Sequence, residues 1–303
     1  AARAPTTLVR HSRRGRPLVS GSSSSSALRR GRRAARGVLR RAAPAAAVAL
    51  SNKPNPPRTR AELLWAAAKL PIYSVALVPV CVGTAAAYAS TGAWCAGRFA
   101  TVMLSSCAVI AWLNLSNDGH DAETGVDAKG AKPESVVNLF GGARTVLVVA
   151  YSLLALGLVG LMSVAARAGD ARVAAFLILA VACGYVYQCP PFRLSYKGLG
   201  EPLCFAAFGP LATTAFYYAA AAGDAPVLIL PQVTAAAAVA ACLVGATTTA
   251  ILLTSHFHQI EGDARAGKRS PVVRLGTRRA ADALTAGVLL AHALAAAACA
   301  TGA

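Results

Sequence analysis

Long apolar runs separated by shorter polar segments set the pattern of this chain from Pro71 onward. A helix needs about 20 apolar residues to cross the hydrocarbon core of a bilayer, and runs of that order recur to the end of the sequence. The pattern predicts seven spanning helices, approximately at 71–91, 99–116, 144–166, 173–189, 200–222, 228–254 and 280–301. We therefore expect residues 71–303 to form an all-α, multi-pass transmembrane helix bundle.

Alternating these helices across a bilayer places the loops 117–143, 190–199 and 255–279 on one face. That face carries most of the basic residues of the apolar region: Lys129, Lys132, Arg144, Arg193, Lys197, Arg265, Lys268, Arg269, Arg274, Arg278 and Arg279. The opposite face is flanked by Arg98, Arg167 and Arg172. By the positive-inside rule the rich face is cytoplasmic, or in an organelle stromal or matrix. A seven-helix transporter would show the same bias, so the rule predicts orientation and not function.

The first 60 residues have a different composition from the rest. The first acid in the chain is Glu62, and arginine clusters and a serine run (22–26) precede it. This composition is typical of an organelle transit peptide, which we assign to residues 1–50; the alternative is a disordered basic tail lying on an anionic membrane. Residues 51–70, with prolines at 54, 56 and 57, are expected to form a linker and an interfacial segment.

The overall charge of +18 is unevenly distributed, and this excludes the obvious nucleic-acid interpretation. Half of the 30 Lys and Arg residues lie before residue 61, which leaves 15 basic residues against all 12 acids and a net charge of +3. The chain is 56% hydrophobic. Its charged residues make up 14%, well below the roughly 25% that is typical of soluble domains. Eight single cysteines without CxxC spacing indicate neither a zinc site nor a disulfide framework.

The first polar loop carries a cluster of acids at the end of the second apolar run. If the helix continues through it, Asn117 and Asp121 share a face, as do Asp118 and Asp121. Mutual repulsion makes such a cluster costly unless a cation neutralises it. Oxygen ligands suit Mg²⁺, which typically binds through one or two carboxylates plus substrate phosphates. The candidate ligands are Asn117, Asp118, Asp121 and Asp127; the alternative is a solvated acidic loop.

The second polar loop repeats this chemistry and adds cations directly after the acids. Its candidate metal ligands are Gln259, Glu261 and Asp263, and its candidate diphosphate-binding residues are Lys268 and Arg269. Carboxylates for the ions and cations for the remaining phosphate charge are what a metal-bridged diphosphate needs. His256 and His258 also raise the possibility of zinc, but their i, i+2 spacing points them to different sides of a helix.

A third polar stretch, 185–201, lies between the two acidic loops. Two prolines end a helix there, and Arg193 and Lys197 follow as further diphosphate-binding candidates, or as interfacial anchors. The tyrosines could form an aromatic belt. Alternatively, the ring of Tyr187 could stabilise a carbocation by cation–π attraction, which makes it a catalytic candidate together with Asp118, Asp121 and Asp263.

With the three loops assembled, the chain resembles the UbiA superfamily of intramembrane prenyltransferases from about Arg60 to the end. The resemblance rests on Asn-Asp-x-x-Asp in one loop, an acidic second loop before Gly-Lys, and Pro-x-Arg-x-x-Tyr-x-Gly-Leu-Gly-Glu between them. It implies a bundle of nine helices around a cavity open to the membrane, with two Asp-rich loops that hold Mg²⁺ and bind a prenyl diphosphate. Seven predicted helices, and an end inside an apolar run at Ala303, suggest a sequence cut short.

Two departures from the general family pattern narrow the resemblance. Gly125 stands where many relatives have the last Asp of the first motif, with Asp127 two residues later, and Gln259 replaces an Asp of the second. Both features look like the naphthoate branch, as do the stretches 132–139 and 268–276. In that branch a phytyl group is attached to 1,4-dihydroxy-2-naphthoate in phylloquinone synthesis and the ring carboxylate is lost.

The resemblance therefore implies that metal ions and cations stabilise a departing diphosphate, and that the naphthoate ring attacks the resulting allylic cation. Together with the leader, it points to a plastid membrane with the acidic loops on the stromal side. Homogentisate prenyltransferase or chlorophyll synthase, with the same diphosphate machinery, is the alternative within this class. A transporter using the acids as a cation gate is the alternative outside it, although transport sites lie near the bilayer midplane and these acids cluster at helix ends.

Overall fold

The predicted spanning helices are present in the structure, a computed structural model that describes residues 59–124, 135–222 and 232–302. In these ranges, seven helical segments are long and apolar enough to cross a membrane. They are Arg60–Thr91, Ala96–Glu123, Ala143–Ala168, Ala171–Gln188, Gly200–Ala221, Ala235–His256 and Pro271–Thr301. The all-α, multi-pass prediction is confirmed. The predicted leader, Asp127 and the expected start of the sixth span at residue 228 lie outside the described residues.

The first span is assembled from three pieces. Helix α2 (Arg60–Ala68) begins at a capping box in which Thr59 and Glu62 exchange side-chain-to-backbone hydrogen bonds. Lys69 ends it in a left-handed conformation (φ 45°), and the 3₁₀ turn η1 (Leu70–Tyr73) leads into α3 (Ser74–Thr91). The segment expected to be a linker thus becomes helical at Arg60, because a local cap starts a helix ahead of the apolar run.

Helix α4 (Ala96–Thr124) extends beyond its predicted end at residue 116 and includes the acidic motif. The short helix α5 (Val136–Phe140) follows, and then α6 (Ala143–Ala168) and α7 (Ala171–Gln188) form a pair of spanning helices. The 3₁₀ turn η2 (Leu194–Lys197) connects α7 to the fifth span. Because α4 stays helical, its acids occupy fixed helical positions rather than a loose loop.

The fifth span consists of α8 (Gly200–Ala206), a π-helical turn η3 (Ala207–Thr213) and α9 (Thr214–Ala221). Pro210 lies in the π turn. Proline lacks an N–H and its ring crowds the carbonyl four residues earlier, so a π turn accommodates it within a continuous helix. Thr213 completes the turn by donating its hydroxyl to the carbonyl of Phe208 at 2.7 Å.

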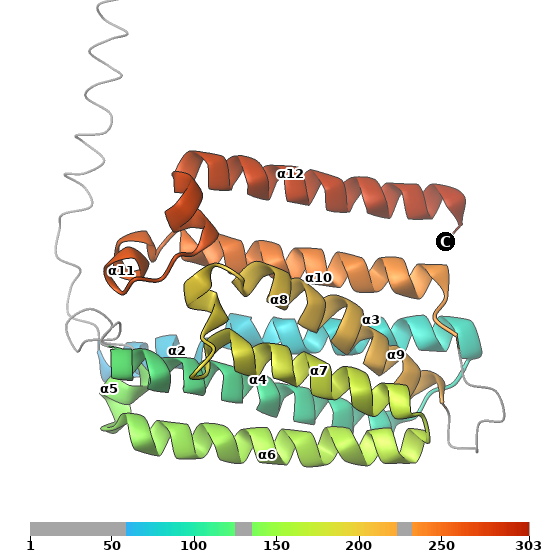
Figure 1. Ribbon diagram of the computed structural model, residues 1–303. Helices are drawn as coiled ribbons and strands as arrows, with labels where there is room; N and C mark the ends of the chain where they lie inside the picture. The colour runs from blue at the N-terminus through green and yellow to red at the C-terminus, as the bar shows by residue number, and fades with distance from the viewer. Residues whose placement is uncertain (1–58, 125–134, 223–231, 303) are drawn as a thin grey trace, which may run out of the picture. The chain divides into compact units, whose positions relative to one another are not determined.

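The helices run side by side as a bundle, with α3 next to α9, α4 next to α6, and α10 (Ala235–His256) next to η3 (Figure 1). Small residues allow close approach: Gly209 of η3 lies against the backbone of Ala241 and Gly245 in α10. Contacts of this kind are how membrane helices pack without a hydrophobic driving force between them. Large apolar side chains on the outside of the bundle are exposed, including Leu104 and Val159, as expected for a surface that faces lipid.

The last helix, α12 (Pro271–Thr301), contacts α10 and α11 (Ile260–Arg265) at the edge of the described bundle (Figure 1). It begins well before its predicted start at residue 280. Gly276 interrupts it with φ 76° and ψ 162°, a conformation that favours glycine because it has no Cβ. The chain therefore turns between a short helical piece, Pro271 to Leu275, and the apolar span.

At the end of the bundle opposite the acidic motif, polar side chains form a partly buried cluster. Asp170 caps α7 and accepts hydrogen bonds from the backbone and guanidinium of Arg172, the shortest at 2.7 Å. The same guanidinium lies 3.9 Å from the centre of the Tyr218 ring. The hydrogen bonds from Arg172 hold the pKa of the Asp170 carboxyl below its usual value.

Candidate active site

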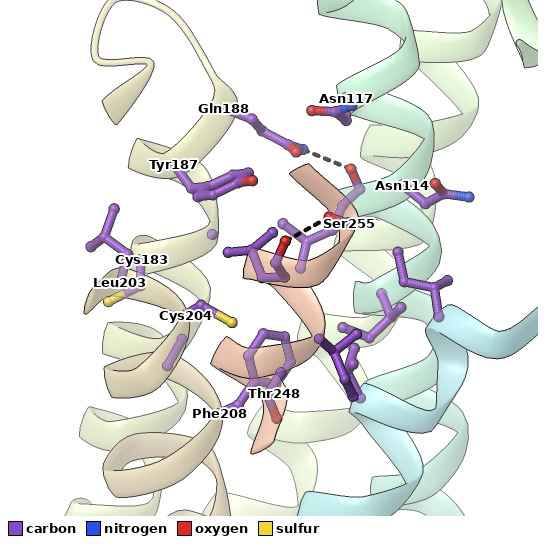
Figure 2. Close-up of a pocket in the computed structure, with 18 of the residues that line it drawn as sticks. Asn114, Asn117, Cys183, Tyr187, Gln188, Leu203, Cys204, Phe208, Thr248 and Ser255 are labelled. Carbon is purple, nitrogen blue, oxygen red and sulfur yellow. Dashed lines mark hydrogen bonds between the residues drawn. The ribbon is translucent and has the colours of Figure 1, made fainter. Parts of the chain in front are cut away.

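A cavity of about 1070 Å³ opens between α3, α4, α7, α8, η3 and α10 and is covered at one end by α11. Figure 2 shows its two kinds of lining. Asn117 of α4 lies opposite Gln188 of α7 at one end, which Asn114 and Tyr187 also line, while apolar side chains such as Phe208 line the wall farther along. The polar end is the end that carries the acidic motifs. The cavity can therefore hold a charged group at that end and a long apolar group within the bundle.

The first motif places two of its predicted ligands on the cavity wall. Asn117 donates an amide hydrogen bond to Asp121 Oδ2 at 3.1 Å, and the Tyr196 hydroxyl donates to Asp121 Oδ1 at 2.9 Å. All three residues line the cavity. The shared face predicted for Asn117 and Asp121 at i, i+4 is therefore present, because α4 remains helical through Thr124.

Asp118, also a predicted ligand and catalytic residue, lies on a different side of α4. Its carboxylate is fully buried and does not line the cavity as the described residues form it. Oδ1 is 2.9 Å from the Lys69 ammonium, and Oδ2 accepts a longer hydrogen bond, 3.4 Å, from the backbone N–H of Val136. The structure therefore separates Asp118 from Asp121, and assigns the former to the junction of α2, α4 and α5.

The second motif folds over the polar end of the cavity. Gln259 precedes α11, and Gln259, Glu261 and Asp263 all line the cavity. Asp263 is 2% exposed; its Oδ1 is 3.4 Å from the Lys268 ammonium, and its Oδ2 is buried without a hydrogen-bond partner among the described residues. A buried carboxylate oxygen without a partner is costly, and a metal ion or an additional donor from a ligand would satisfy it.

The predicted diphosphate-binding cations do not all reach the cavity. Lys268 lines it, whereas Arg193, Lys197 and Arg269 are not among the lining residues in the described part of the chain. Arg193 pairs with Glu123 at 3.5 Å. The main chain of the other two supports the fold: the Lys197 carbonyl accepts from Arg274 at 2.9 Å and the Arg269 N–H donates to the Tyr196 carbonyl.

Several polar residues line the cavity that the sequence did not single out as site residues. Lys69 is one, and its ammonium donates to both Asn114 Oδ1 and Asp118 Oδ1 at 2.9 Å. His256 is another, and its Nδ1 lies 3.1 Å from Glu201 Oε1, which explains this histidine as half of a buried pair. Tyr187, which the sequence did single out as the carbocation partner, lines the cavity as well. A basic residue beside an apolar run, such as Lys69, is indistinguishable in sequence from an interfacial anchor.

The donor set can be tested for its fit to magnesium. Within the described residues, no three His, Cys, Asp or Glu side chains come together as a ready-made metal cluster. The Asn117–Asp121 pair and the unpartnered Asp263 oxygen instead offer oxygen atoms from two sides of the polar end. This arrangement fits an ion that completes its coordination with substrate phosphates and water, as Mg²⁺ does, and it does not resemble a closed structural site.

The sequence is similar to a known family and to two named relatives. The UbiA prenyltransferase family matches residues 76–303. The chain is 51% identical over 222 residues to "2-carboxy-1,4-naphthoquinone phytyltransferase, chloroplastic" of Arabidopsis thaliana, covering 73% of this chain and 57% of the relative. It is 45% identical over 233 residues to "2-carboxy-1,4-naphthoquinone phytyltransferase" of Synechocystis sp., covering 77% of this chain and 72% of the relative.

The chain thus spans little more than half the length of the Arabidopsis protein. No solved structure shows a significant match. The family match covers most of the chain and includes both acidic motifs and the stretch between them, and the resemblance inferred from those motifs is confirmed. This chain belongs to the UbiA prenyltransferase family.

Proposed function

We propose that this protein transfers a phytyl group, or another polyprenyl group, from its diphosphate to 1,4-dihydroxy-2-naphthoate, with loss of the ring carboxylate. The observation that carries the proposal is the polarity of one cavity, which joins oxygen ligands and cations at one end to an apolar interior. The names of the two relatives, both phytyltransferases that act on a carboxylated naphthoquinone, support the choice of substrates.

Asn117, Asp121 and Asp263 are the residues of the described chain that would hold magnesium, with Gln259 and Glu261 beside them. When bound, the ion supplies positive charge that stabilises the departing diphosphate. The Lys268 ammonium, which lines the cavity next to Asp263, adds a second charge for the phosphate oxygens. The apolar wall takes the prenyl chain and excludes water from the allylic cation, and the Tyr187 ring stabilises that cation.

The bonds in this reaction balance without a protein base. The ring carbon that carries the carboxylate forms a bond to the first prenyl carbon as the bond between that carbon and the diphosphate breaks. The carboxylate then leaves as carbon dioxide, and its bonding electrons restore the aromatic ring. No proton has to be removed from the ring, so an unprotonated side chain beside the ring is not a requirement of the site.

Mass analysis of products tests the proposal directly. Purified protein, with magnesium and a panel of prenyl diphosphates, should convert 1,4-dihydroxy-2-naphthoate to a prenylated product that has lost carbon dioxide. Homogentisate and chlorophyllide serve as the alternative acceptors. A product from either of these and none from the naphthoate would overturn the assignment, and absence of transfer to any acceptor would favour a transporter.

The proposed location is a plastid membrane, with the acidic loops on the stromal side. The charge distribution across the loops and the basic, serine-containing leader support it, and the Arabidopsis relative is named as chloroplastic. Plastid import followed by N-terminal sequencing tests the leader. A cysteine introduced in the loop 255–279 should react with a membrane-impermeant reagent from the stromal side, and labelling only from the lumen would contradict the orientation.

A further inference from the structure

Lys69 stands out as a cation in the cavity that the proposed diphosphate site does not use. It lines the cavity on the α4 side, whereas Lys268 and Arg265 belong to the segment around α11. Its ammonium makes two hydrogen bonds among the described residues, to Asn114 and to Asp118. A lysine ammonium has three protons, so one donor remains for a ligand.

The backbone conformation of Lys69 indicates that a lysine side chain is needed at this position. Lys69 and Arg193 are the non-glycine residues with positive φ in the described chain. Glycine or asparagine adopts the left-handed region more readily than lysine does. A lysine held in this conformation, with its ammonium fixed by two α4 side chains, indicates that the charge has a use beyond ending α2.

The position of the ammonium relative to the first motif suggests what it binds. Asn114 lies three residues before Asn117 on α4 and also lines the cavity. Three residues of helix rise about 4.5 Å, so Lys69 places a positive charge about one turn from the Asn117–Asp121 pair. Two anionic groups bound at these two places would lie close together at the polar end.

We propose that Lys69 binds the carboxylate of the aromatic acceptor and so positions the ring for attack. This inference rests on the proposed function. In that reaction each of the two reacting carbons carries an anionic group: the carboxylate on the ring carbon and the diphosphate on the first prenyl carbon. Anchoring both anions at the same end of the cavity brings the two reacting carbons together. Lys69 is a substrate-positioning residue in this scheme and takes no part in proton transfer.

The alternative is that Lys69 binds the diphosphate of the prenyl substrate. The following experiment distinguishes binding of the acceptor carboxylate from binding of the diphosphate. Binding of 1-hydroxy-2-naphthoate and of 1-naphthol, which differ by the carboxylate, is measured by calorimetry on detergent-solubilised full-length protein. Wild type should prefer the carboxylated compound by about 10- to 100-fold, the range for a hydrogen bond between charged groups. Lys69→Met should lose the preference and Lys69→Arg should keep most of it. The KM for prenyl diphosphate should change less than about threefold, a small part of the effect of a lost charge-assisted bond.

Lys69→Met leaves the buried Asp118 carboxylate without this ion pair and so can destabilise the fold. The double variant Lys69→Met/Asp118→Asn removes both charges and should bind both compounds equally while remaining folded. Arg167→Gln, an exposed residue at the opposite end of the bundle, is the matched control for loss of one positive charge.

Two outcomes overturn the inference. One is a carboxylate preference that survives in Lys69→Met and in the double variant. The other is a rise in the KM for prenyl diphosphate with acceptor binding unchanged, which would assign Lys69 to the diphosphate. Failure of the proposed function is a separate result, namely absence of naphthoate prenylation by the wild type.

Discussion

Replacement of Gly209 by alanine is a sharp test of how closely η3 and α10 approach each other. A Cβ at residue 209 would lie 2.6 Å from the carbonyl oxygen of Ala241, 2.9 Å from Gly245 Cα and 3.0 Å from Gly245 N. Unstrained contacts between such atoms need about 3.5 Å. All three neighbours are backbone atoms, so no side-chain rotation can relieve the overlap, and α10 must move away by roughly 1 Å, the shortfall from that contact distance.

The expected cost follows from two opposing effects. Overpacking in a well-packed interior destabilises by about 1–3 kcal/mol, whereas alanine in a helix gains up to about 1 kcal/mol over glycine. The overlap should therefore win, and Gly209→Ala should unfold at a lower temperature than wild type. Because α10 ends at Ser255 and His256 beside the cavity, prenyl transfer should fall as well.

The assay is thermal unfolding of purified protein in detergent, with Gly287→Ala as the control. A Cβ at residue 287 of α12 meets nothing within 4 Å in the described structure, so that variant should equal or exceed wild type in stability. Equal stability of the two variants would refute the close helix approach on which the prediction depends.

Three further predictions concern charged and polar residues. Asp121→Asn preserves shape and removes charge, so it should abolish prenyl transfer while thermal unfolding stays close to wild type; more than about half the activity at saturating magnesium would contradict a metal role. Asp263→Asn should likewise abolish turnover, whereas Gln259→Asp should be tolerated and lower the magnesium requirement in a titration at fixed prenyl diphosphate; the reverse pattern would refute our assignment of the second motif. The lowered pKa of Asp170 means that its bonds to Arg172 stabilise the fold above about pH 3.9, the ordinary aspartate value, and that this stability is lost as pH falls through the lower folded-state pKa. Asp170→Asn keeps a capping side chain, so its deficit in thermal stability should be constant from pH 5 to 7 and shrink below about pH 4, near that ordinary value; a deficit independent of pH would contradict the ion pair.

Hydropathy predicted the spanning helices because apolar length is a constraint that the bilayer imposes on the sequence directly. The boundaries depend on finer signals. The capping box at Thr59 starts α2 inside the expected linker, and Gly276 lets α12 begin at Pro271. Such local devices change the ends of helices by several residues and leave the apolar pattern unaltered.

The site was predictable where helical spacing decides it. Asn117 and Asp121 are four residues apart, and α4 places both on the cavity wall. Asp118 belongs to the same motif, but its direction depends on Lys69, which is 49 residues earlier in the chain. Arg193 similarly pairs with Glu123 of α4, 70 residues earlier in the chain. Partners that are brought together by tertiary packing leave no local signal in the sequence. For that reason the first motif was predicted as one ligand set, whereas the structure separates Asp118 from the other ligands on the cavity wall.

The gradient of polarity along the cavity gives the proposed reaction a direction. Before transfer, each substrate of the proposed reaction carries an anion that holds it at the polar end. Afterwards the diphosphate and carbon dioxide have left, and the joined product has no charge for Lys69, Lys268 or a metal to retain. Its chain gains about 0.8 kcal/mol per CH₂ group in an apolar medium, so the product partitions into the bilayer. Loss of both anions during the reaction is therefore expected to favour release of the product from the polar end of the cavity.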